Sequence, residues 1–389
     1  MKKICICTTI SLTMKIFVIP TVKYLYEKCG YNITLICNPD KEFEKTLPDY
    51  INFIPVNMNR GIDFSALNSI VHFIKIFREQ KFDLVQYSTP NAACYASIAA
   101  KICKVPVRLY CQWGIRYVGL SGVGRSFFKL VEKMICKNST DIRAQSFLNL
   151  KFAVEEGLYK KDKALVVGKG GTVGVDSKVF DISQKQNWKL NIRRKYSIAE
   201  NEFVYGYSGR ITIDKGCREL LTAFREIEKT QKRCKLFIVG ILDESCGIDI
   251  ELIEWAKKSK NVIFTGMIEG SNMCQYYSAM DVLVHPTYRE GFGMVIQEAG
   301  ALAVSVITTN VPGASEVLED GISAIHVTVR NSFELMKAML YMYNNQEKVT
   351  AMGINAYKRT MDLYERKIML ENQKKDYDIL FEKVKRNEV

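Results

Sequence analysis

Two glutamates, Glu290 and Glu298, flank a Gly-Phe-Gly sequence in the stretch HPTYREGFGMVIQEAG. The apolar run DVLVHP precedes them and closes at Pro286, so we expect a buried strand, a loop and a helix that starts near Phe292 or Gly293. The first N–H groups of such a helix suit an anion, and carboxylate oxygens suit the vicinal hydroxyls of a sugar. Taken alone, this pattern is more typical of a surface helix with solvated glutamates than of a ligand site.

A pair of cations follows another apolar run. After FVYGYS come Gly209 and Arg210, and five residues later Lys215 and Gly216 open a predicted helix. Arginine offers a planar fork and lysine a point charge to phosphate oxygens, and glycine lets the backbone come close to a ligand. This strand-to-helix turn suits a diphosphate group, and ordinary surface charge is the alternative.

The glycine-rich stretch VVGKGGTVGVD spans residues 166–176 and holds four glycines. The first apolar run and its continuation, ICICTTISLT, hold none. The G-x-G-x-x-G fingerprint of a dinucleotide-binding dehydrogenase is therefore missing where such an enzyme needs it. As a connection between domains, the glycine-rich stretch suits a phosphate-facing loop and a flexible linker equally well.

The net charge of +13 is unevenly distributed along the chain. Residues 1–180 hold 26 Lys and Arg against 14 Asp and Glu, whereas residues 181–389 hold 29 against 28. A basic first half predicts an anionic partner: nucleic acid, a phosphorylated substrate or an acidic membrane surface. We expect no nucleic acid partner, because the chain has neither an interleaved aromatic platform nor a known nucleic-acid-binding motif.

A predicted helix over residues 123–137 carries much of this charge on one face. Arg125, Lys129, Lys133 and Lys137 recur every four residues, and apolar side chains fill much of the rest. Such a helix can lie on an anionic bilayer with aromatic side chains inserted. It is also typical of an amphipathic helix packed on its own domain with solvated lysines. The charge excess of this half favours the membrane surface.

Cysteine and histidine usage predicts no metal site. The twelve cysteines form no CxxC pair and have no histidine at metal-binding spacing, and there are only three histidines. Free thiols of this kind fit a reducing cytoplasm.

No apolar run approaches the roughly 18–20 residues of a membrane-spanning helix. The N-terminus is predicted to be a buried strand rather than a signal peptide, because Lys15 interrupts its apolar run and no small-residue cleavage site follows.

Short β-branched runs alternate with helical patterns along the whole chain, as in parallel sheets covered on both faces. The first half offers the strand candidates KICICTT, NITLIC, FDLVQY, VPVRLYCQ and ALVVG. The second half offers FVYGYSG, CKLFIVG, NVIFTG, DVLVHP, VSVITT and SAIHV. Residues 181–202 between them are polar and charged, as a connection between two cores would be, and residues 359–389 read as a charged amphipathic helix or helix pair.

These elements predict an α/β fold of two doubly wound, Rossmann-like domains. Ligands of open parallel sheets bind outside the carboxyl ends of the strands. We therefore expect the two domains to face a central cleft that holds the ligand. Both candidate sites in the second half follow strands and fit this expectation.

The Gly-Arg-x4-Lys-Gly sequence of residues 209–216 and the Glu-x7-Glu sequence of residues 290–298, with NVIFTG between them, resemble the GT-B glycosyltransferases of family 4. The resemblance covers nearly the whole chain, and the first half looks like bacterial enzymes that build capsular, O-antigen or exopolysaccharide repeat units. It implies an N-terminal acceptor-binding domain at 1–182, a nucleotide-sugar-binding domain at 183–365, and a C-terminal helix, about 366–389, that completes the first domain.

The resemblance assigns roles to single residues. Arg210 and Lys215 would hold the donor diphosphate and stabilise the leaving phosphate. Glu290 would contact the donor sugar near the reacting carbon, and Glu298 would bind the ribose hydroxyls. The remaining donor contacts would be Gly209, Gly291, Phe292 and Gly293 for sugar and phosphate, and Gly266 and Met267 for the base.

The first half departs from the family at one position. Many relatives carry a histidine at the end of the strand that matches RLYCQWG, where this chain has Trp113, so the role usually given to that histidine is not carried over. Trp113 and Arg116 are candidates for substrate contacts, and the nearby Gln112 and Tyr117 are further candidates for acceptor or donor contacts. Family members are retaining enzymes that generally need no metal, so we expect no cofactor and front-face attack, with the leaving phosphate taking the acceptor proton.

The implied activity is transfer of a hexose or N-acetylhexosamine from a nucleotide sugar, UDP-linked, to an undecaprenyl-diphosphate-linked saccharide. The expected partners are this donor, the lipid-linked saccharide acceptor and an anionic membrane surface contacted by the basic N-terminal half. The expected location is cytoplasmic, peripheral on the inner face of the bacterial plasma membrane. The alternatives are a soluble enzyme of the same fold with a small acceptor, and a sugar-nucleotide epimerase or hydrolase.

Overall fold

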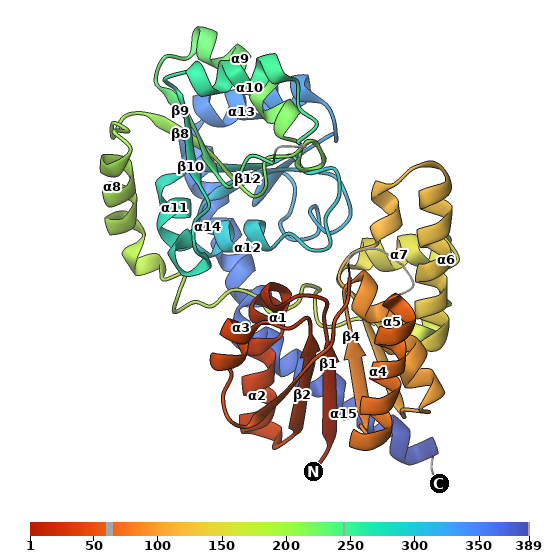
Figure 1. The fold of residues 1–389 in the computed structure, drawn as a ribbon. Helices are drawn as coiled ribbons and strands as arrows, with labels where there is room; N and C mark the ends of the chain where they lie inside the picture. The colour runs from red at the N-terminus through yellow and green to blue at the C-terminus, as the bar shows by residue number, and fades with distance from the viewer. Residues whose placement is uncertain (60–64, 244–245, 388–389) are drawn as a thin grey trace. The chain divides into compact units, whose positions relative to one another are not determined.

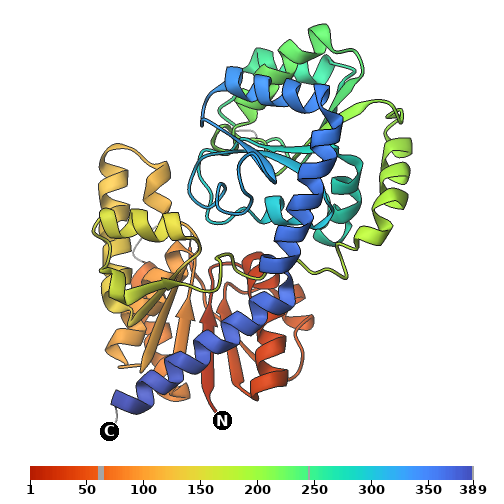
Figure 2. The same cartoon turned by 180° about the vertical axis from the view of Figure 1, so that it is seen from behind.

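The computed structural model describes residues 1–59, 65–243 and 246–387 of the chain. They form two compact units, a first unit of Met1–Val173 with Ile368–Val389 and a second unit of Gly174–Lys367 (Figures 1 and 2). Each unit is built on one open parallel sheet, and in each the strand order reverses beside the unit's first strand. This is the doubly wound, Rossmann-like arrangement, so the predicted fold class is confirmed.

The first sheet runs in the order β3-β2-β1-β4-β5-β6-β7. Its strands are β1 (Lys3–Cys7), β2 (Asn32–Cys37), β3 (Ile51–Pro55), β4 (Leu84–Tyr87), β5 (Val107–Gln112), β6 (Asp141–Ala144) and β7 (Ala164–Val166). The helices around it are α1 (Ser11–Phe17), α2 (Ile19–Cys29), α3 (Lys41–Lys45), α4 (Ser65–Gln80), α5 (Pro90–Ile102), η1 (Arg116–Gly119), α6 (Gly122–Asn138), α7 (Phe147–Glu155) and, from the end of the chain, α15 (Arg366–Asn387).

Helices cover both faces of the first sheet. On one face, Phe73 and Phe77 of α4 belong to a buried core shared with α5 and α6. On the other, Leu25 of α2 packs in one cluster with Leu380 and Phe381 of α15. Figure 2 shows α15, in blue, lying along this sheet. The end of the chain therefore supplies part of the core of the first unit.

The second sheet runs in the order β10-β9-β8-β11-β12-β13. Its strands are β8 (Phe203–Ser208), β9 (Cys234–Val239), β10 (Val262–Gly266), β11 (Val282–His285), β12 (Ser305–Thr309) and β13 (Ala324–Val327). Its helices are α8 (Lys185–Lys195), α9 (Cys217–Thr230), α10 (Ile250–Lys258), α11 (Met273–Ala279), α12 (Met294–Ala301), α13 (Ser332–Asn344) and α14 (Gln346–Tyr364). Apolar residues of α9, α10 and α13 pack with the strands in one core.

The predicted strands are all present, but two strands of the first sheet were not predicted. Each of the predicted runs contains a strand, whereas β3 and β6 lie outside all of them. The sequence of β6, DIRA, is half charged, and its charges are balanced by distant residues. Arg143 forms an ion pair with Asp376 and Asp141 with Lys383, both partners lying on α15. Local composition could not reveal a strand that is neutralised from the other end of the chain.

The prediction that residues 181–202 are a plain connection is wrong for residues 185–195, which form α8. Arg193 of α8 is buried, at 3% exposure. Its guanidinium donates to the carbonyl oxygens of Ala279 and Glu202 and to the Asp281 carboxylate, at 3.2, 2.9 and 2.7 Å. A helix this polar can pack on its unit because its arginine is satisfied there.

The C-terminal segment forms the helix pair that was one of the two predicted arrangements. Helix α14 ends at Tyr364 and α15 begins at Arg366.

No helix among residues 1–59, 65–243 and 246–387 is long and apolar enough to cross a membrane.

Candidate active site

The two sequence motifs of the second unit come together at the carboxyl edge of its sheet. Strands β8 and β11 are parallel neighbours, so the segments that follow them, 209–216 and 286–293, leave the sheet side by side. The Lys215 Nζ atom lies 2.8 Å from Oε2 of Glu290, and both side chains are about one-fifth exposed. The structure thus joins residues that lie 75 positions apart in the sequence.

Glu290 is held as an anion. Its Oε2 atom also lies 3.2 Å from Nε2 of His285, and its Oε1 accepts a 3.3 Å hydrogen bond from the Gly291 N–H. Burial acts to raise the pKa of Glu290, but the hydrogen bond with His285 and the charge of Lys215 outweigh it and hold the pKa well below its usual range. An ionised carboxylate only accepts hydrogen bonds, which suits it to sugar hydroxyls.

Direct contacts fix the two segments against each other. The N–H of Tyr288 donates to the carbonyl of Asp214 at 2.9 Å, and the Arg289 guanidinium lies 3.3 Å from the Asp214 carboxylate. Gly216 has a φ of +73°, and a Cβ there would lie 1.9 Å from the Pro286 carbonyl oxygen. Glycine is therefore required where the backbones meet.

Two residues of the Gly-Phe-Gly segment, Phe292 and Gly293, have different roles. The N–H of Gly293 donates to the carbonyl of Gly313 at 3.1 Å, and α12 begins at the next residue, close to the predicted start. The Phe292 side chain is buried against Tyr364, with ring centroids 5.4 Å apart. Only the backbone of Phe292 therefore suits a ligand contact, and its ring belongs to the core.

Glu298 lies on α12, and a tyrosine hydroxyl rather than a lysine contacts its carboxyl. The Tyr277 hydroxyl donates to its Oε2 at 2.8 Å and lies 3.1 Å from Oγ of Ser208 at the end of β8. Burial raises the pKa of Glu298 to about 7, although the Tyr277 hydrogen bond and the charge of Arg366 act in the opposite direction. Near neutral pH this carboxyl therefore gains and loses a proton.

The other donor candidates lie on neighbouring segments of the second unit. The Arg210 side chain is 65% exposed and lies 4.0 Å from the Asp243 carboxylate, beyond β9. Gly209 is close to Gly240, where a Cβ would lie 1.8 Å from the Gly209 carbonyl oxygen. At the end of β10, Gly266 has a φ of +74° and Met267 is exposed. All of these residues sit at or beyond carboxyl ends of strands, and their contacts with a ligand stay predictions.

Two family models match the chain. The model for glycosyl transferases group 1 matches residues 189–359, and the model for glycosyl transferase 4-like proteins matches residues 3–146. Together they take in most of both units. The chain belongs to the GT-B glycosyltransferases of family 4. The family and the enzyme class predicted from the two motifs are therefore confirmed.

Named relatives align with this glycosyltransferase over nearly its full length. The capsular polysaccharide biosynthesis glycosyltransferase CapM of Staphylococcus aureus is 29% identical, with 92% of each chain covered. The N,N'-diacetylbacillosaminyl-diphospho-undecaprenol alpha-1,3-N-acetylgalactosaminyltransferase of Campylobacter jejuni is 21% identical over 95% of this chain and 96% of its own. The crystal structure of Anabaena Alr3699/HepE in complex with UDP and glucose has a TM-score of 0.80 at 17% identity, covering 97% of this chain and all of that one, which establishes a shared fold.

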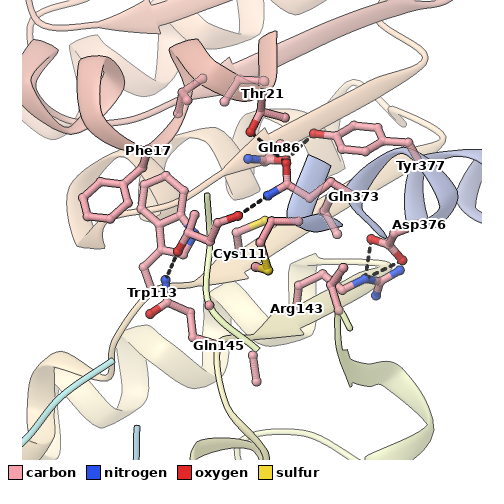
Figure 3. A pocket seen from close by; sticks show the side chains of 18 residues that line it. Phe17, Thr21, Gln86, Cys111, Trp113, Arg143, Gln145, Gln373, Asp376 and Tyr377 are labelled. Carbon is pink, nitrogen blue, oxygen red and sulfur yellow. Dashed lines mark hydrogen bonds and ion pairs between the residues drawn. The ribbon is translucent and has the colours of Figure 1, made fainter. Parts of the chain in front are cut away.

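In the first unit of the glycosyltransferase, Trp113 lines a cavity of about 50 Å³ (Figure 3). Its ring packs against Phe17, with centroids 5.2 Å apart. The polar side chains of the cavity wall include Thr21, Gln86, Arg143, Gln145, Thr172, Gln373, Asp376 and Tyr377. Most of these are already paired, for example Thr21 with Gln373 at 2.7 Å. A cavity of this size holds a few water molecules or one small polar group.

The neighbours of Trp113 make contacts within the first unit. The Arg116 guanidinium lies 4.2 Å from the centre of the Phe128 ring on α6. The Gln112 amide donates at 2.6 Å to the buried carboxyl of Glu132, whose pKa is raised by burial. The Tyr117 hydroxyl is hydrogen-bonded to Glu156. The structure does not bring Arg116 into the wall of the Trp113 cavity, and these contacts give Gln112 and Tyr117 a role in packing.

Two residues beside the candidate site were missed by sequence reasoning. His285 was considered only as a metal ligand, although its position as the last residue of β11, directly before the loop, was a usable signal. Tyr277 was not singled out, because nothing in MCQYYSA marks one tyrosine as the partner of a glutamate 21 residues later.

Within the described part of the chain, no group of three or more His, Cys, Asp and Glu side chains could hold a metal ion.

Proposed function

We propose that this glycosyltransferase moves a hexose or N-acetylhexosamine from a UDP-linked donor, with retention, to an undecaprenyl-diphosphate-linked saccharide in surface polysaccharide biosynthesis. The names of the S. aureus and C. jejuni relatives, which align along nearly the whole chain, support the pathway and the lipid-linked acceptor. The UDP and glucose bound by the Anabaena protein support the type of donor.

The observation that carries the proposal is the Lys215–Glu290 pair at the edge of the second sheet. Lys215 and Arg210 offer positive charge to the donor diphosphate and stabilise the phosphate that leaves. Glu290, kept ionised beside them, accepts hydrogen bonds from the sugar hydroxyls. Glu298, eight residues further on and on α12, is the candidate for the ribose hydroxyls of the donor. The contact between this cation and this carboxylate supports a phosphate site next to a sugar site.

The proposed step needs no protein nucleophile. The acceptor hydroxyl oxygen bonds to the anomeric carbon on the face from which the nucleotide departs, as the bond from that carbon to the phosphate oxygen breaks. The departing phosphate takes the hydroxyl proton, so UDP leaves with the electron pair and the configuration is retained. The residues of the second unit act by positioning and by stabilising the charge that develops on phosphate.

The proposal includes peripheral attachment to the inner face of the plasma membrane through α6. On this helix Val123, Phe127 and Leu130 are exposed, at 87%, 45% and 67%. Lys133 and Lys137 are exposed as well, whereas Lys129 is paired with Glu156 at 2.6 Å. Exposed apolar side chains beside lysines suit a surface of anionic lipid.

Alanine replacements test the site. Glu290→Ala and Lys215→Ala are each expected to reduce transfer to an undecaprenyl-diphosphate-linked acceptor by at least about 100-fold. Lys215→Ala removes charge that stabilises the leaving phosphate, and Glu290→Ala removes the acceptor that positions the sugar hydroxyls. Glu347→Ala and Lys348→Ala, on the exposed surface of α14, are the matched controls and should leave the rate unchanged. Full activity in both site variants would overturn the assignment of the site.

The acceptor is tested separately. Transfer by the wild type is measured with the lipid-linked acceptor and with a short soluble saccharide, each with and without vesicles of anionic lipid. We expect the lipid-linked acceptor to be preferred and anionic vesicles to increase its rate. A soluble acceptor used equally well, with no effect of vesicles, would favour the soluble enzyme of the same fold.

A further inference from the structure

His285 makes a contact with the candidate site that no sequence motif includes. It ends β11 and its side chain is 3% exposed. Its Nε2 atom lies 3.2 Å from Oε2 of Glu290, the same oxygen that Lys215 approaches to 2.8 Å. Its Nδ1 atom is buried and has no hydrogen-bond partner among the residues that the structure describes.

These contacts determine which nitrogen of the His285 imidazole carries the proton. Burial and the nearby charge of Lys215 lower the pKa of His285, and together they outweigh the opposite effect of Glu290. A neutral imidazole has one N–H, and an ionised carboxylate can only accept. The proton of His285 therefore lies on Nε2 and is donated to Glu290, while Nδ1 stays unprotonated.

Lys215 and His285, which both approach Oε2 of Glu290, differ in how firmly they are placed. Lys215 has a flexible stem and, under the proposed function, must also serve the diphosphate. His285 is anchored in the sheet, because β11 pairs with β12 and the Thr308 hydroxyl donates to the His285 carbonyl at 3.0 Å. When Lys215 turns toward phosphate, the histidine bond stays in place.

We propose that His285 is a positioning residue for the donor sugar. Its Nε2–H keeps the Glu290 carboxylate oriented for the sugar hydroxyls while Lys215 binds the diphosphate. This inference rests on the proposed function in one respect, namely that Glu290 contacts the sugar. The inference adds to the site a residue that lies outside both motifs. It attributes the effect of His285 on sugar binding to its hydrogen bond with Glu290 and not to the shape of its side chain.

Calorimetry can isolate the contribution of the sugar to binding. The probes are UDP and whichever of UDP-glucose, UDP-galactose, UDP-N-acetylglucosamine and UDP-N-acetylgalactosamine the full-length wild type binds most tightly. The ratio of the two dissociation constants, UDP over UDP-sugar, reports the sugar contact. His285→Leu removes the donor, and His285→Gln retains an N–H donor at a similar reach. His326→Leu is the control, because His326 is a partly buried histidine on another strand, β13, of the same sheet.

We expect His285→Leu to lower this ratio about 10-fold, as for loss of a hydrogen bond to a charged group, with the Kd of UDP itself unchanged. His285→Gln should restore most of the ratio, and His326→Leu should not alter it. A wild-type ratio in His285→Leu overturns the inference. Equal weakening of UDP and UDP-sugar also overturns it, because that result indicates general damage to the fold. Failure of His285→Gln to restore the ratio does the same.

Glu290→Ala separates this inference from the proposed function. If Glu290→Ala lowers the ratio and His285→Leu does not, only the role of His285 is wrong. If Glu290→Ala leaves the ratio at its wild-type value, or if the wild type binds no UDP-sugar more tightly than UDP, then the assignment of Glu290 to the sugar fails and the role of His285 fails with it.

Discussion

Glu290 and Glu298 are the same residue type, eight positions apart, yet their surroundings give them opposite acid–base behaviour. Glu290 has a lysine and a histidine against one oxygen, and its pKa is lowered despite burial. Glu298 has a tyrosine hydroxyl, and burial raises its pKa to about 7. A charged partner at contact distance, rather than burial as such, decides which carboxyl stays ionised at neutral pH.

The raised pKa of Glu298 predicts a pH-dependent stability. A carboxyl whose pKa is higher in the folded protein stabilises the fold while it is protonated, fully so below its unfolded value of 4.5, and this contribution is lost as pH rises through about 7. Compared with Glu298→Gln, which does not titrate, the wild type should lose about 2–3 kcal/mol of stability between pH 4.5 and pH 8. Urea unfolding of both proteins across this range measures the difference.

The matched control for this titration is Glu347→Gln, on the exposed surface of α14. Its stability relative to the wild type should stay nearly constant over the same pH range. A constant difference for Glu298→Gln as well would show that the pKa of Glu298 is the same in the folded and the unfolded protein, contrary to the effect of burial described above.

At the scale of the elements, the site depends on two segments that follow neighbouring parallel strands and touch through their backbones. Gly216, with a φ of +73°, is the point of closest approach to Pro286. Gly216→Ala should destabilise the second unit by at least about 2 kcal/mol, because the added Cβ meets a carbonyl oxygen and the backbone conformation disfavours an L side chain. Thermal and urea unfolding measure the loss.

Gly270→Ala provides the comparison, because its Cβ would meet no atom within 4 Å and its φ is not in the left-handed region. It should be neutral within about 0.5 kcal/mol. Equal stability of the Gly216 and Gly270 variants would mean that the two segments are not in contact as described.

The second unit was more predictable from sequence than the first, for a physical reason. Its six strands are apolar runs that end at polar or glycine residues, so periodicity alone found them. In the first unit, β6 was missed because Asp141 and Arg143 are neutralised by α15. For the same reason α8 was not predicted. Its Arg193 can be buried only because Ala279 and Asp281, which are distant in sequence, accept its hydrogen bonds.

The residues of the candidate site also differ in whether the sequence alone could predict them. Arg210, Lys215, Glu290 and Glu298 were found because charged residues beside glycines at strand ends are conspicuous in a sequence. His285 and Tyr277 were not, since their importance comes from partners that only the fold supplies. Arg116 was a candidate because it is close to Trp113 in sequence; in the fold its guanidinium lies against Phe128, and its contact with a substrate stays a prediction.

At the scale of the whole molecule, the first unit combines both ends of the chain, and a buried ion pair joins them. The Arg143 guanidinium contacts both oxygens of Asp376 on α15, at 2.9 and 2.8 Å, with each side chain 8% exposed. Replacing either residue alone, in Arg143→Met or Asp376→Leu, should destabilise the first unit by about 3–5 kcal/mol, because the remaining charge is left buried without its partner. The double variant should recover much of this loss.

A double-mutant cycle followed by urea unfolding measures the coupling. The control cycle uses Lys229 and Glu226 of α9, an exposed pair at 2.7 Å whose coupling should stay below about 1 kcal/mol. Additive effects of the Arg143 and Asp376 replacements would contradict a tight pairing of α15 with β6.

The position of α15 in the first unit also sets an order of events during synthesis. The ribosome completes β1 to β7 early, but α15, which helps to cover one face of their sheet, emerges only after the whole second unit has been made. The second unit, Gly174–Lys367, is continuous in sequence and can fold as soon as it is complete. The first sheet meanwhile lacks α15 on the face that also carries α2, so part of its apolar surface is exposed. The nascent chain is therefore expected to be most prone to aggregation just before α15 emerges.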